Sequence, residues 1–113
     1  MPRLRAQGRI YRSDTEEFNV LERFDYFVDL DRIQDLHLEI DEGETVTIDP
    51  TVYGMTGYTD LYVITDQPVT LTMSGQDFTL SESLFLRGVL QTGSLLINNA
   101  LPSAASLRVI IGQ

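Results

Sequence analysis

Apolar and polar residues alternate with a period of two along almost the whole of this chain of 113 residues. The clearest example is TDLYVITDQPVTLTMSG, residues 59 to 75, in which two alternating runs meet at Asp66-Gln67-Pro68. Successive side chains of a β-strand point to opposite faces of a sheet, so such runs are typical of half-buried strands, and the residues between them favour a turn. We therefore predict a β-hairpin here, with Val69, Leu71 and Met73 facing the core.

The same alternation predicts eight or nine short strands over the whole chain. No window of about 11 residues or more has a convincing helical period. Turn residues such as Asp41-Glu42-Gly43-Glu44 separate the runs at roughly the 8–12-residue spacing of sandwiches and barrels. We expect an all-β fold, an antiparallel β-sandwich. A jelly roll is the leading topology, because eight strands in two Greek keys fit this length, and an immunoglobulin-like sandwich is the second.

The composition narrows the class of protein. A hydrophobic fraction of 42% is too high for a disordered chain. No apolar run approaches the roughly 20 residues of a membrane-spanning helix, so we expect no membrane partner. The chain has no cysteine, which excludes a disulfide framework and a thiolate zinc site.

The charges are unevenly distributed within a net charge of −9. Arg3, Arg5, Arg9 and Arg12 all precede the first acidic residue, Asp14. We predict an extended basic N-terminal arm over residues 1–15 and a single sandwich domain over residues 16–113. A basic arm on an acidic body suits docking onto another acidic surface. Four arginines without interleaved aromatic residues make a poor nucleic-acid site, so we expect no nucleic-acid partner.

Catalysis has little support in the sequence. His37 is the single histidine, and its strand parity places it among acidic residues on a polar face. The sequence has no G-x-S-x-G nucleophile elbow. The stretch HLEIDEGETVTIDP resembles a cupin strand pair, but a cupin metal site needs several histidines. We expect no enzyme, no catalytic residue and no cofactor.

Calcium is the metal that the sequence leaves open. Asp29, Asp31 and Asp35 in DLDRIQD resemble the start of an EF-hand loop. However, Ile33 occupies the third ligand place, and Ile40 occupies the place of the closing glutamate. We expect no metal site and keep a weak loop site at the three aspartates as the alternative.

Three tyrosines around TVYGMTGYTDLY suggest a sugar site. Tyr53, Tyr58 and Tyr62 could stack on the apolar faces of sugars while their hydroxyls stay in water. The alternative is that one or two of them close the end of the sandwich. A carbohydrate-binding module is accordingly the second functional hypothesis.

The second half of the chain, from Thr59 onward, resembles small structural proteins of tailed bacteriophages. The features that carry the resemblance are LYVITDQPVTLTMSG and GSLLINNALPSAASLRVIIGQ, which combine a strand, an Asn-Asn loop with small residues, and a closing strand. Such families include jelly-roll decoration (cement) proteins, which bind capsids as dimers or trimers. The resemblance implies a non-enzymatic protein of the virion, present in the host cytoplasm before assembly, with the major capsid protein or another virion protein as its partner.

This hypothesis assigns roles to particular residues. Pro2 to Arg12 would lie across capsid subunits, with the four arginines Arg3, Arg5, Arg9 and Arg12 meeting acidic groups. In the carbohydrate-binding alternative, the protein would be a component of the tail tip or fibre.

Self-association is a separate expectation. Tyr62 and Ile64 stand on the parity opposite the apolar Leu61 and Val63, so that strand is apolar on both faces, and Ile110 repeats the pattern near the C-terminus. A strand of this kind is either central or in contact with another subunit. We predict a homodimer or homotrimer with Tyr62, Ile64 or Ile110 near the contact.

Overall fold

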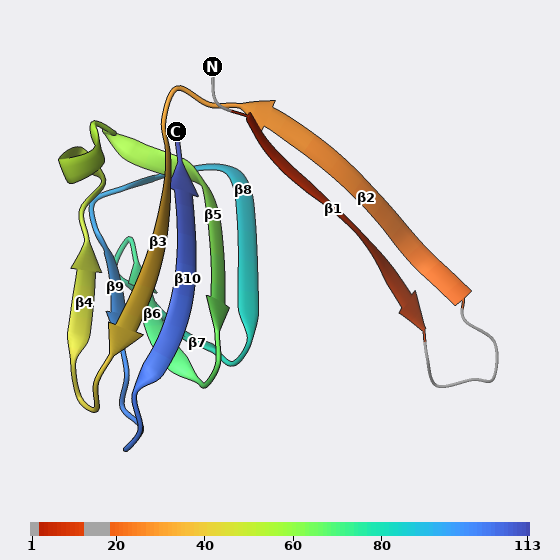
Figure 1. Cartoon of the computed structure of the whole chain (residues 1–113). Helices are drawn as coiled ribbons and strands as arrows, with labels where there is room; N and C mark the ends of the chain where they lie inside the picture. The colour runs from red at the N-terminus through yellow and green to blue at the C-terminus, as the bar shows by residue number, and fades with distance from the viewer. Residues whose placement is uncertain (1–2, 13–18) are drawn as a thin grey trace. The chain divides into compact units, whose positions relative to one another are not determined.

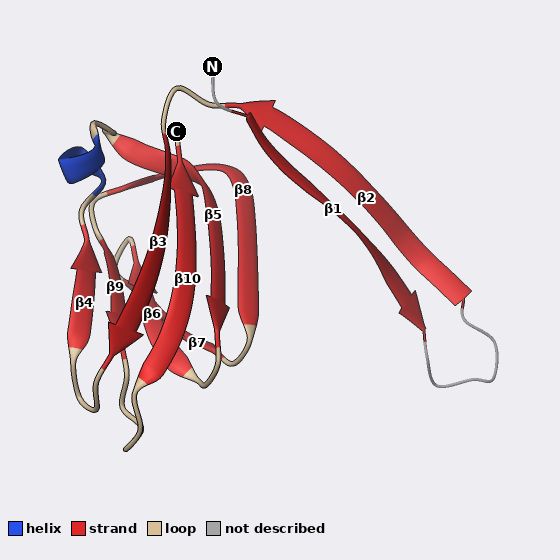
Figure 2. Cartoon of the chain, viewed as in Figure 1, coloured by secondary structure: helices blue, strands red, loops and turns tan. Residues whose placement is uncertain are grey.

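The computed structural model of the chain describes residues 3–12 and 19–113, and nearly all of its regular structure is β-strand (Figure 1, Figure 2). In chain order the elements are β1 (Arg3–Arg12), β2 (Asn19–Asp29), β3 (Ile33–Ile40), β4 (Thr45–Ile48), the 3₁₀ helix η1 (Pro50–Tyr53), β5 (Gly57–Thr65), β6 (Val69–Met73), β7 (Gln76–Leu80), β8 (Ser83–Thr92), β9 (Leu95–Asn98) and β10 (Ala105–Gly112). The prediction of an all-β fold is confirmed.

The strands divide into two compact units, Met1–Leu30 and Asp31–Gln113. The first unit contains β1 and β2, and we call these two strands the ribbon. The second unit contains the other eight strands, and we call residues 31–113 the body. The sequence predicts an arm over residues 1–15, and the described part of it, β1, pairs along its whole length with β2.

The body is a sandwich of two four-stranded antiparallel sheets, with strand orders β3-β10-β5-β8 and β4-β9-β6-β7. The pairing is nested along the chain: β3 pairs with β10, β4 with β9, β5 with β8 and β6 with β7. This nesting is the jelly-roll arrangement of two Greek keys. The leading topology is therefore confirmed, and the immunoglobulin-like alternative is not the one that the chain adopts.

The hairpin predicted between β5 and β6 is wrong. β5 lies in one sheet and β6 in the other, so Asp66-Gln67-Pro68 carries the chain across the sandwich. Asp66 anchors this corner to β10, because its backbone N–H donates to Ser106 O (3.2 Å) and its Oδ1 accepts from the Ser106 N–H (2.9 Å). The tight hairpin of this region is the next one, β6–β7, which turns through Ser74-Gly75.

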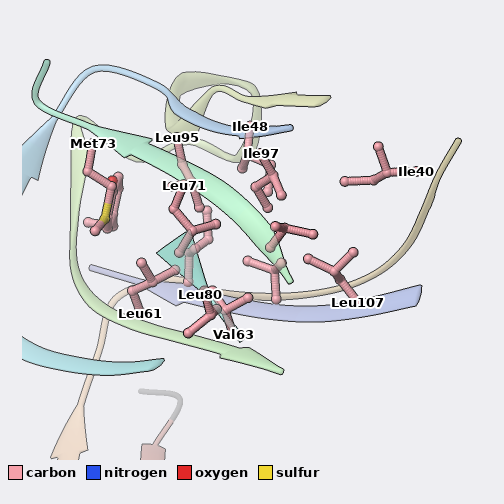
Figure 3. Packing of buried hydrophobic residues seen from close by; sticks show 14 of the residues in the cluster. Ile40, Ile48, Leu61, Val63, Leu71, Met73, Leu80, Leu95, Ile97 and Leu107 are labelled. Carbon is pink, nitrogen blue, oxygen red and sulfur yellow. The ribbon is translucent and has the colours of Figure 1, made fainter. Parts of the chain in front are cut away.

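The core lies between the two sheets of the body (Figure 3). β6 illustrates how the sequence builds it, because Val69, Leu71 and Met73 are buried while Thr70 and Thr72 are only half-buried. The three inward positions predicted for β6 are confirmed. Each such side chain contributes about 1.5–3 kcal/mol by leaving water, so the body has a core of its own.

Candidate interaction surfaces

The ribbon has two different faces. Register partners in an antiparallel pair share a face, and faces alternate along each strand. One face holds the positions Leu4 and Val28, Ala6 and Tyr26, Gly8 and Phe24, and Ile10 and Glu22; since Glu22 is its one charged position among these pairs, we call it the apolar face. The other holds Arg3 and Asp29, Arg5 and Phe27, Gln7 and Asp25, Arg9 and Arg23; we call it the charged face.

This register divides the four arginines that we predicted to bind a partner. Arg3, Arg5 and Arg9 occupy the charged face, whereas Arg12 falls on the side of the apolar face, beyond an irregularity in the pairing. The expected extended arm is indeed extended over β1, but it is one half of a paired ribbon rather than a single free strand. Pro2 lies outside the described residues.

The outward face of the sheet β3-β10-β5-β8 brings together the three residues predicted at an oligomer contact. Ile110 stands opposite Tyr62 in the register, and Ile64 lies two residues further along the same strand as Tyr62. On the other side Tyr62 is opposite Phe85, and the two rings pack edge to face with centroids 6.1 Å apart. Ile64 is 41% exposed. The subunit contact itself stays a prediction.

Charged residues border this apolar row. Arg108 donates two hydrogen bonds to Asp35, from Nε (3.1 Å) and Nη2 (2.7 Å). These bonds hold the pKa of the Asp35 carboxyl below its usual value. His37 Nε2 lies 3.8 Å from Asp35 Oδ1, and the His37 side chain is 73% exposed. Because all three side chains are largely in water, the cluster stabilises the fold very little.

Asp60 is a buried carboxylate that alternation did not single out. The residue is 2% exposed, and its Oδ1 accepts a hydrogen bond from Thr59 Oγ1 (3.0 Å). Within the described part of the chain Oδ2 has no hydrogen-bond partner, and Arg87 Nε lies 3.9 Å from it. A shift in the pairing of β5 and β8 between Tyr58 and Asp60 breaks the alternation at this point, so parity could not predict the burial.

The three tyrosines predicted for sugar stacking do not form one platform. Tyr58 is buried (1% exposed) in the core, and burial raises the pKa of its phenol. Tyr53 packs against the same core from η1, whereas Tyr62 lies on the outward sheet face. A buried ring cannot stack on a sugar, so Tyr58 drops out of the predicted site, and the alternative that these residues close the sandwich applies to Tyr53 and Tyr58.

The three aspartates considered for a weak calcium site do not form a metal site among the described side chains. Asp31 and Asp35 are exposed, and Asp35 is occupied by Arg108. The side chain of Asp29 lies outside those that the structure describes. No group of three His, Cys, Asp or Glu side chains that could hold a metal ion occurs among the described residues.

An apolar groove opens between the two sheets beside β7 and β8. Its volume is about 520 Å³. The apolar residues that line it are Leu71, Met73, Phe78, Leu80, Leu84 and Leu86. At one end the Ser74 hydroxyl donates a hydrogen bond to Gln91 Oε1 (2.6 Å), which ties the β6–β7 turn to β8. The sequence places these residues in strands, but their exposure depends on which strands form the sheet edges.

Comparison with known proteins supports the fold and is silent on function. No protein-family model matches the sequence, and a comparison with curated proteins finds no match. Among solved structures the chain is similar to a de novo designed double-stranded β-helix, with a TM-score of 0.54 and 14% sequence identity. The match covers 69% of this chain and 97% of the designed one. At this identity the likeness concerns the fold alone. No helix of the described residues is long and apolar enough to cross a membrane.

Proposed function

We propose that this chain is a non-enzymatic structural protein that decorates the capsid of a tailed bacteriophage, bound to the major capsid protein or to another protein of the virion. In this proposal the body is a stable module displayed on the particle, and the ribbon is the element that makes contact with other polypeptides. The protein acts in the virion and resides in the host cytoplasm before assembly.

The ribbon is the observation that carries the proposal. A two-stranded sheet buries no core of its own and is marginal at best in water. The ribbon nevertheless has an apolar face, which includes the positions of Phe24 and Tyr26. Apolar surface of this kind is a feature of protein interaction sites. A unit with this pattern would be stabilised by docking onto another surface, as an attachment element is.

The charges support the same role. The unit Met1–Leu30 has five arginines against six acidic residues, a net charge of −1, whereas Asp31–Gln113 has three arginines against eleven acidic residues, a net charge of −8. Strand β1 contains four of the arginines and no acidic residue. Guanidinium groups bind carboxylates through paired hydrogen bonds, so the charged face suits acidic groups on a capsid surface.

The single histidine of the chain lies on an open sheet face of the body. His37 and Asp35 are exposed on a sheet face, with the His37 side chain 73% exposed. The carbohydrate-binding alternative loses support because Tyr58 is in the core. Both observations favour a role in binding proteins.

Charge reversal on the ribbon tests the proposal. The triple variant Arg3→Glu, Arg5→Glu, Arg9→Glu should no longer co-sediment with particles produced by the virus whose genome encodes the chain. The triple glutamine variant should bind weakly, because it removes the attraction without adding repulsion. Arg32→Glu, on the body, is the matched control and should bind as the unmodified protein does. Equal occupancy of the particle by the wild type and the triple glutamate variant would rule out the basic strand as the attachment element.

A further inference from the structure

The groove beside β7 and β8 lies at an open side of the sandwich. Both strands are terminal in the strand orders of their sheets, so each has one edge that pairs with no other described strand. Unpaired strand edges offer backbone N–H and C=O groups to another chain. An extended segment that adds to β8 would therefore gain main-chain hydrogen bonds and cover the groove at the same time.

The inner face of β8 is apolar and incompletely covered. Leu84 and Leu86 stand opposite Val63 and Leu61 of β5, which are fully buried, yet both leucines are only half-buried. Across the groove Phe78 stands opposite the buried Leu71 and is itself 46% exposed. The core is thus open along this side, and a further strand with an apolar inner face would close it.

The ribbon has the properties that this edge requires. Each of its two strands has one edge that pairs with no other described strand, because β1 and β2 form a two-stranded sheet. If β1 or β2 joined β8, the apolar face of the ribbon would continue the face of Leu84 and Leu86 over the groove. The charged face would then lie on the side away from the groove.

The connection between the units decides which copy can supply the ribbon. From Asp29 at the end of β2 to Ile33 at the start of β3 the chain advances four residues, which span about 14 Å at most. A strand added beyond β8 is four inter-strand spacings from β3, or about 19 Å. If the ribbon paired with β8 up to Asp29, this connection would be too short to reach that edge of the same body, whereas the ribbon of a second copy is not limited by it.

Charge and area also favour a second copy. Two bodies of net charge −8 repel one another, and a ribbon unit of net charge −1 avoids most of that repulsion. One face of the ribbon measures roughly 33 Å by 10 Å. Two reciprocal contacts would bury up to about 1,300 Å² in total, which exceeds the ~1,000 Å² expected of a specific interface.

We propose that the ribbon of one copy adds to strand β8 of a second copy and covers its β7–β8 groove with the apolar face, in a reciprocal, two-fold symmetric dimer. Reciprocal exchange closes the assembly, because both ribbons and both grooves are then used. The proposal rests on the proposed function in treating the ribbon as the contact element, and it names a second copy of this chain as one of its partners.

The test measures mass by light scattering coupled to size-exclusion chromatography, on purified full-length protein without particles. The wild type should elute as a dimer at micromolar concentrations. Phe78→Asp, in the groove, and Tyr26→Asp, on the apolar face, should each be monomers. Leu101→Asp is the matched control for Phe78→Asp, since it places the same charge at an apolar residue of similar exposure (38%) in the loop before β10, and it should remain a dimer.

A mixing experiment separates exchange from general damage to the protein. Equal amounts of Phe78→Asp and Tyr26→Asp should form a dimer held by one contact, because the first variant keeps an intact ribbon and the second keeps an intact groove. Circular dichroism checks that each variant is folded, and Phe78→Ser replaces Phe78→Asp if the latter is not.

Three results would overturn the proposal: a wild type that is monomeric at millimolar concentration, loss of the dimer in Leu101→Asp but not in the folded Phe78 variant, or a mixture that stays monomeric. Because no particle is used, loss of capsid binding in the charge-reversal experiment leaves these results unaffected, and the two proposals fail separately.

Discussion

At the scale of the residue, Asn99 shows how a polar side chain can hold the body together. It is fully buried, and its Nδ2 donates to Ile40 O (2.8 Å) and Ser103 O (2.7 Å). Its Oδ1 accepts from the Leu101 N–H (3.1 Å) and from Gln67 Nε2 (3.0 Å). One amide thus joins the end of β3, the β5–β6 corner and the loop before β10.

We expect Asn99→Ala to lower the free energy of unfolding by about 2–4 kcal/mol, because buried partners are left without hydrogen bonds. Asn98→Ala is the matched control: the side chain of Asn98 bonds to Glu44 O and Thr45 Oγ1 in an exposed setting, so its loss should cost below about 1 kcal/mol. Urea denaturation measures both. Equal losses of unfolding free energy in the two variants would show that the buried hydrogen bonds of Asn99 stabilise the fold no more than the exposed ones of Asn98.

The burial of Tyr58 predicts that the stability of the folded protein depends on pH. Burial raises the pKa of its phenol above the usual value of 10.0, so the folded state holds the proton more tightly than the unfolded state does. The stability that depends on this proton is complete below pH 10 and declines as the pH rises through the folded-state pKa. Tyr58→Phe has no phenol to titrate.

We therefore expect the stability of the Tyr58→Phe variant relative to wild type to increase between pH 8 and pH 11. Denaturation midpoints at the two pH values measure the change. A constant difference would show that the Tyr58 phenol is not held protonated in the folded state.

At the scale of the element, the alternating pattern predicts faces but not partners. It identified β5 and β6 as strands with apolar inner positions, and those positions are buried. It could not show that the two strands belong to different sheets, because a corner and a hairpin use the same turn residues. The alternating pattern could not predict the burial of Asp60 either, since a shift in the pairing between strands changes which side chains face inward.

The β6–β7 turn gives a prediction for one element. Ser74 and Gly75 both have positive φ, 50° and 77°, as a two-residue type I′ hairpin turn requires. A Cβ at Gly75 would meet no atom within 4 Å, so only the backbone conformation opposes a substitution. Gly75→Ala should cost about 1 kcal/mol, and Gly75→Asn less, because asparagine tolerates this conformation better. Thermal denaturation that ranks alanine equal to or above asparagine would contradict this explanation.

At the scale of the whole molecule, the sequence predicted a β-sandwich, and the nested strand pairing confirms the jelly roll. The boundary between the two units was not predictable, because residues 19–29 alternate just as the strands of the body do. A sequence pattern records that one side of a strand is buried, and it does not record whether the covering surface belongs to the same sheet, the same chain or another molecule. The same ambiguity hides the candidate surfaces: the outward row of Tyr62, Phe85 and Ile110 and the groove near Phe78 depend on which strands end up at the edges.

The central proposal is that this jelly roll is a virion component whose ribbon is completed by other polypeptides. Electron cryomicroscopy of the purified virus particle measures this most directly. We predict repeated copies of the body on the capsid surface, with the apolar face of each ribbon covered by another copy and the charged face against the capsid. Particles without this chain, or with copies whose ribbons touch no other polypeptide, would contradict the claim.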